Sequence, residues 1–145
     1  MNDVVLVAVN DSEAAFTAAR VAVRYASLLG ARLRAVTVIE PWESDDRIAE
    51  PDPATLDRRR ELAAQASLRH VAALATASGV EESGIRRLGG VGAEILAEAR
   101  AVDAALIVMA RISRPGHALP YVGSQALRVL EFATAPVLIV PTSPQ

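Results

Sequence analysis

Five short apolar segments alternate with four segments of helical periodicity along the 145 residues of the chain. The apolar segments are rich in Val, Leu and Ile and are short enough to be single buried strands. They cover Val4–Val9, Leu33–Ile39, Ile85–Leu88, Leu106–Ala110 and Val137–Val140. The helical segments cover Glu13–Leu29, Ala54–Ser78, Gly92–Ala101 and Ser124–Ala133. This alternation predicts an α/β fold, with an open parallel sheet between two layers of helices in one domain of residues 1–145.

The core is expected to consist of small aliphatic side chains, because only 3% of the residues are aromatic while 52% are hydrophobic. Helical spacing predicts one buried face for each of the first three helices. In the first helix this face is Ala15, Ala18, Ala19, Ala22, Ala26 and Leu29. In the second it includes Leu62, Ala66, Ala73 and Ala77, and in the third Ile95, Leu96 and Ala99. The short strand at Ile85–Leu88, flanked by charge, is expected at a sheet edge.

Composition and charge exclude several classes of function. The net charge of −2 gives no reason to expect a nucleic-acid or membrane surface. The absence of cysteine excludes disulfides, thiolate catalysis and zinc–thiolate sites. All 15 basic residues are arginine, so no lysine can contact a phosphate, and two histidines far apart predict no metal site. Without a signal-like N-terminus or an apolar run of ~20 residues, the expected location is the cytoplasm.

Two polar loops follow apolar strands in this sequence. Asn10–Ser12 comes after the first strand, and a long loop leads from the fourth strand to Gly123 and Ser124, where a helix begins. In a doubly wound sheet, the loops that follow strands at the switch point meet in one crevice. A helix start next to such a loop favours phosphate binding, and the alternative interpretation is an ordinary long loop before a capped helix.

Taken together, these segments resemble the universal stress protein family. The resemblance rests on Val7–Glu13, Val108–Ala110, Gly123–Ser124 and Ala135–Val140, and it extends in order over nearly the whole chain. It implies a Rossmann-like, adenine nucleotide alpha hydrolase-like sheet of five parallel strands in the order 3-2-1-4-5. It also implies a homodimer that is joined through the last strand, Val137–Val140.

The resemblance also implies a candidate site for ATP or another adenine nucleotide. Members that bind ATP carry a glycine, two residues, a second glycine, nine residues, and then glycine with Ser or Thr. The matching positions here are Ala110, Ser113, Gly123 and Ser124, so only the last two fit the pattern. The family's ribose-binding aspartate corresponds to Asn10. The resemblance further maps Val38 and Met109 to the base and Gln125 to a place beside the phosphates. Apart from the resemblance, Arg111 and Arg114 are candidates for a phosphate clamp because of their fork geometry, and the alternative interpretation is that they are exposed to solvent on the loop.

The departures from the family pattern decide the strength of binding that we expect. Side chains at Ala110 and Ser113 restrict a loop that glycine would leave free, and losing one hydrogen bond to phosphate costs about 1.5–3 kcal/mol. The leading hypothesis is a homodimeric regulator or sensor that binds an adenine nucleotide weakly, with no protein-ligated metal. The alternative is a dimeric interaction module of the stress response that binds partner proteins and no nucleotide. A hydrolase ranks last, because no carboxylate is placed to orient His117 as a base.

Overall fold

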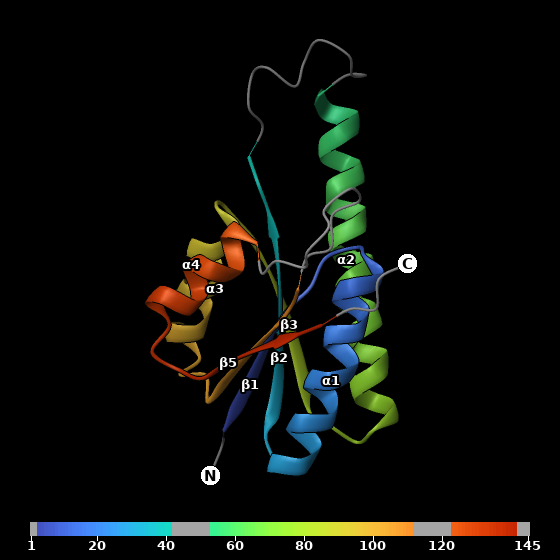
Figure 1. Ribbon diagram of the computed structural model, residues 1–145. Coiled ribbons are helices and arrows are strands. Elements are labelled where there is room, and N and C mark those ends of the chain that lie inside the picture. Colours follow the sequence, from blue (N-terminus) through green and yellow to red (C-terminus); the bar gives the residue numbers. More distant parts are fainter. Residues whose placement is uncertain (1–2, 42–52, 112–122, 142–145) are drawn as a thin grey trace.

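The computed structural model describes residues 3–41, 53–111 and 123–141, and strands and helices alternate along them (Figure 1). The strands are β1 (Val4–Ala8), β2 (Arg32–Ile39), β3 (Glu82–Leu88), β4 (Leu106–Ala110) and β5 (Val137–Val140). The helices are α1 (Glu13–Leu29), α2 (Pro53–Ala77), α3 (Val91–Ala101) and α4 (Ser124–Phe132). Every expected element is present. The largest difference is that β3 begins at Glu82 rather than at Ile85.

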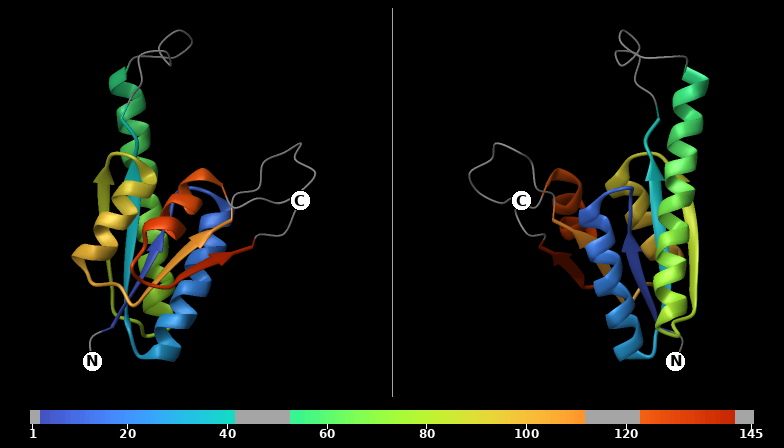
Figure 2. Two further views of the ribbon diagram at one scale, coloured as in Figure 1. Left: turned by 60° about the vertical axis from the view of Figure 1, so that its left-hand side comes forward. Right: turned by 90° about the vertical axis from the view of Figure 1, so that its right-hand side faces the viewer.

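The five strands form one parallel sheet in the order β3-β2-β1-β4-β5. Helices α1 and α2 cover one face of the sheet, and α3 and α4 cover the other (Figures 1 and 2). The expected fold class and strand order are therefore confirmed, as is the position of β3 at an edge. Because the order reverses between β1 and β4, the topological switch point lies between these two strands.

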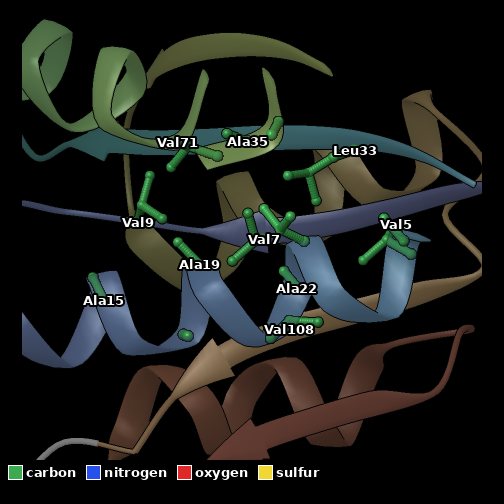
Figure 3. Close-up of a cluster of buried hydrophobic side chains, with 14 of the residues drawn as sticks. Val5, Val7, Val9, Ala15, Ala19, Ala22, Leu33, Ala35, Val71 and Val108 are labelled. Atoms are coloured by element: carbon green, nitrogen blue, oxygen red, sulfur yellow. The ribbon is translucent and has the colours of Figure 1, made fainter. Parts of the chain in front are cut away.

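The centre of the sheet packs on α1 through alanine. Five of the six side chains predicted for the buried face of α1 are buried, and several of them contact β1 in Figure 3. Because alanine adds so little bulk, the helix backbone can lie close to the sheet. The prediction for Leu29 is wrong. Leu29 is the last helical residue, where the chain turns at Gly30 (φ 64°) towards β2, and it is 54% exposed.

The predicted buried face of α2 is wrong. Leu62, Ala66, Ala73 and Ala77 are all exposed, and the positions that face the sheet are Ala64, Ser67, Val71 and Ala75. The cause is the many alanines spread around this helix, which fit a buried and an exposed face about equally well. The amphipathic pattern is therefore too weak to select one face.

The opposite face of the sheet packs against α3 and α4. The buried apolar residues of α3 are the predicted Ile95, Leu96 and Ala99. On α4, Ala126 and Val129 are buried against the same cluster. One side chain in this layer is not apolar: Glu98 of α3 is only 2% exposed.

Glu98 is held by two arginines from neighbouring strands. Its carboxylate accepts hydrogen bonds from Nε of Arg34 at 2.9 Å and from Nε of Arg87 at 3.0 Å. Arg87 also donates to Glu94 at 2.9 Å. The hydrogen bond to Glu94 and the contacts with Glu98 raise the pKa of Arg87 above its ordinary value, although partial burial opposes them. The cluster ties α3 to β2 and β3 through charge as well as apolar contact.

Candidate functional site

A cavity of about 400 Å³ lies at the carboxyl ends of β1, β2 and β4, beside the first turns of α1, α3 and α4. Its floor is apolar and includes Ala8, Val36, Val38, Ile95 and Met109. Its polar lining residues include Asn10, Ser12, Glu40, Arg111 and Ser124. The tips of β1 and β4 therefore meet at the switch point, where open α/β sheets place their ligands.

Two local hydrogen bonds link the tip of β1 to the start of α1. Ser12 is the N-cap of α1, and its Oγ accepts a bond from the backbone N–H of Ala15 at 3.1 Å. The same hydroxyl donates to Oδ1 of Asn10 at 2.5 Å. The side-chain oxygen of Asn10 is thus engaged by Ser12, which leaves the side-chain NH₂ as its donor group. At this strand tip the chain can offer a neutral hydrogen-bond donor to a ligand, rather than a carboxylate.

The start of α4 differs from the start of α1. Its N-cap is Gly123, with φ 95° and ψ 150°, and a glycine has no side chain with which to cap the helix. The positive φ favours glycine at this position, because a Cβ would be strained there. The first backbone N–H groups of a helix have no partner within the helix, and they carry the positive end of its dipole. Gly123, Ser124, Gln125 and Ala126 line the cavity, so this positive end lies at its wall.

Arg111 adds a cation to the same region. Its backbone N–H donates to the carbonyl of Val140 at 2.8 Å, which extends the pairing of β4 with β5. Its half-buried side chain lines the cavity and makes no ion pair with any residue in the described part of the chain. Glu40, at the tip of β2, is the single carboxylate among the described lining residues.

The structure brings eight of the nine candidate residues to this cavity, namely Asn10, Val38, Met109, Ala110, Arg111, Gly123, Ser124 and Gln125. The ninth, Ser113, lies outside the described residues, as do Arg114 and His117. Sequence reasoning missed the contribution of α3, whose Val91 and Ile95 also line the cavity. The predicted strand order contains the signal, because the connection from β3 to β4, which includes α3, must cross over both β2 and β1.

No group of three or more His, Asp or Glu side chains among the described residues is arranged to hold a metal ion. None of the helices in residues 3–41, 53–111 and 123–141 has the length and apolar character that a membrane span requires.

The sheet order and the crevice at its switch point define an open, doubly wound α/β protein. The strand order is that of the adenine nucleotide alpha hydrolase-like fold. The universal stress protein family matches residues 1–141, and the chain belongs to this family. A search of curated protein sequences finds no match.

Several solved structures are similar to the chain over nearly its full length. One is a protein of the universal stress protein family from Burkholderia pseudomallei, with 28% identity and a TM-score of 0.73, covering 97% of this chain and 96% of the other. A universal stress protein in complex with cAMP has 25% identity and a TM-score of 0.73, and the similarity covers 97% of this chain and 98% of the other. The universal stress protein from Archaeoglobus fulgidus in complex with dAMP has 20% identity and a TM-score of 0.70, and the similarity covers 97% of this chain and 98% of the other.

Proposed function

We propose that this protein binds an adenine nucleotide in the crevice between β1 and β4 and acts as a regulator or sensor. The observation that carries the proposal is the N-terminus of α4, whose N-cap Gly123 has no capping side chain and which lies at the wall of a cavity with an apolar floor. A phosphate at this helix end would accept hydrogen bonds from the first backbone N–H groups of the helix and compensate the positive pole. The family relative in complex with cAMP supports the same class of ligand.

In the proposed arrangement, a different set of lining residues contacts each part of the nucleotide. The base packs on the apolar floor beside Val38 and Met109, and the phosphate lies against Gly123 and Ser124 with Arg111 at its side. The sugar lies near Asn10, whose NH₂ group donates to a sugar or phosphate oxygen. A neutral donor at this place does not repel a phosphate esterified to the sugar, so a cyclic or singly phosphorylated nucleotide is compatible with it.

Binding is proposed to be regulatory rather than catalytic. Among the described lining residues the only carboxylate is the exposed Glu40, and no histidine accompanies it. General-base activation of water needs a base within hydrogen-bond reach of the attacking oxygen. Incubation with ATP should accordingly release no phosphate over hours, and steady release would contradict this part of the proposal.

The proposal is tested by calorimetric titration with ATP, AMP and cAMP. We expect saturable binding by the natural protein and at least tenfold weaker binding by Gly123→Ala, because alanine strains the loop at φ 95°. Gly30→Ala is the matched control, since Gly30 also has a positive φ (64°) but caps α1 away from the crevice. No binding at millimolar nucleotide would overturn the proposal, as would equal losses in the two variants.

We also propose that the chain forms a homodimer through β5, in line with the expectation from the sequence. Strand β5 lies at the edge of the sheet and reads Val-Leu-Ile-Val, without a charged residue. Leu127 and Leu130 of α4 are 51% and 43% exposed. Gln125 and Arg128 lie on the flank of α4 that faces α3. Because successive residues of a helix are rotated by about 100°, the two leucines lie on the opposite flank of α4, towards the β5 edge. A second copy would cover this apolar margin.

A further inference from the structure

The side chain of Gln125 caps a different helix from its own. Its Oε1 accepts a hydrogen bond from the backbone N–H of Gly92 at 2.9 Å. Gly92 is the second residue of α3, and Gly90, the N-cap of that helix, makes no side-chain cap hydrogen bond. Gln125 therefore supplies the cap that α3 lacks, from the first turn of α4.

The two helices also approach each other closely at this point. Gly92 is buried, and a Cβ built on it would lie 3.0 Å from Oε1 of Gln125 and 3.0 Å from Cδ of Arg128. It would also lie 3.3 Å from the carbonyl oxygen of Gln125. The backbone of α3 thus contacts the first turn of α4 directly, because glycine leaves room for it.

We propose that Gln125 is a positioning residue for the phosphate end of the crevice, an inference that rests on the proposed function. Ala126 and Val129 are buried against the sheet, but the two residues before Ala126, at the very start of α4, have no buried apolar side chain. The bond to Gly92 fixes this first turn against α3. The backbone N–H groups of residues 124–126 are then held at the cavity wall before any ligand binds.

This assignment differs from the role expected from the sequence, in which Gln125 lies beside the phosphates as a contact. Its side-chain oxygen is engaged with α3, so its effect on a phosphate is transmitted through the placement of its own helix turn. The effect should then depend on the phosphate. Nucleotides that reach the start of α4 should be sensitive to Gln125, whereas adenosine, which has no phosphate, should not.

The test compares AMP with adenosine in three variants. Gln125→Met keeps the length of the side chain but removes the acceptor oxygen, and we expect about three- to tenfold weaker AMP binding with unchanged adenosine binding. Arg128→Met is the matched control on the same flank of α4, one turn away from the start, and should bind both ligands normally. Gln125→Glu keeps an acceptor oxygen for Gly92.

Hydrogen exchange at the Gly92 amide provides a readout that does not depend on the ligand. We expect protection of this amide in the natural protein, loss of protection in Gln125→Met, and retained protection in Gln125→Glu. If the natural protein binds no nucleotide, the proposed function fails while the exchange data still report the cap. The positioning role is overturned if Gln125→Met binds AMP normally, or if AMP and adenosine weaken equally.

Discussion

Glu98 shows how one polar residue can be built into an apolar layer. Its carboxylate is 2% exposed, and both oxygens are engaged, one by Arg34 and the other by Arg87. The two arginine side chains keep 24% of their surface in solvent, so their charge is only partly buried. The pairing offsets the cost of burying the carboxylate, and removing Glu98 leaves Arg34 without this partner, while Arg87 keeps its ion pair with Glu94.

Removing this carboxylate is therefore expected to destabilise the fold strongly. We expect Glu98→Ala to lower the free energy of unfolding by about 3 kcal/mol, at the lower end of the range for broken buried pairs because the arginines retain access to water. Urea denaturation measures the change. Glu94→Ala is the control: Glu94 is 25% exposed and, within the described part of the chain, pairs only with Arg87, so less than about 1 kcal/mol should be lost. Equal losses of unfolding free energy in the two variants would contradict this distinction between the buried Glu98 and the more exposed Glu94.

At the scale of elements, the helices differ in how well their sequence defines their orientation. Helix α1 carries polar residues such as Arg20 and Arg24 on one side and alanines on the other, and five of the six predicted positions are buried. Helix α2 has alanine around its whole circumference. Its orientation is set by contacts that sequence periodicity does not contain, such as the ion pair of Glu61 with Arg86 of β3 at 2.6 Å.

Alanine has different structural roles in these two helices, which can be measured. We expect Ala22→Leu in α1 to destabilise the protein by about 1–3 kcal/mol, because Ala22 is fully buried and a larger side chain would overpack the core. Ala73→Leu in α2 makes the same chemical change at an exposed position and should stay within about 0.5 kcal/mol. Thermal unfolding of both variants distinguishes the roles. A neutral Ala22→Leu would show that α1 does not pack as closely as described.

Strand ends and small-residue loops made much of the crevice predictable. Asn10 and Gly123 stand out because each follows or precedes an element boundary that the sequence marks clearly. The roles of Gln125 and Glu98 could not be predicted in the same way. A lone glutamine or glutamate on a helix is typical of a solvated face, and only the tertiary arrangement reveals that each side chain is engaged by another element.

The whole molecule has two sheet edges of opposite character. Strand β3 carries Glu82, Arg86 and Arg87, and two of these make ion pairs with helices. Charged residues at an edge discourage pairing with another chain. Strand β5 has no such protection. The carbonyls of Pro136 and Val140 accept hydrogen bonds from β4. Because the backbone N–H and C=O groups of successive residues in a strand point to opposite sides, those of Val137 and Ile139 point to the open edge.

This arrangement gives a direct test of the proposed dimer. Sedimentation of the natural protein at micromolar concentration should give a mass near twice 15.3 kDa. Ile139→Pro removes an N–H that points away from β4 and should yield a monomer, while Ile139→Val should remain a dimer. Because proline also changes packing, Leu127→Glu with Leu130→Glu provides a second route to the monomer on an exposed surface. A monomeric natural protein would refute the proposal.

The glycine N-cap of α4 has a consequence for the lifetime of the protein, if the proposed nucleotide site is correct. An anion that binds at this helix end makes the folded state more stable as the anion becomes more plentiful. A ligand present at 100 times its dissociation constant adds about 2.7 kcal/mol to the stability of the fold that binds it. Under the proposed function, the half-life of the chain against proteolysis would then lengthen as the concentration of the nucleotide rises.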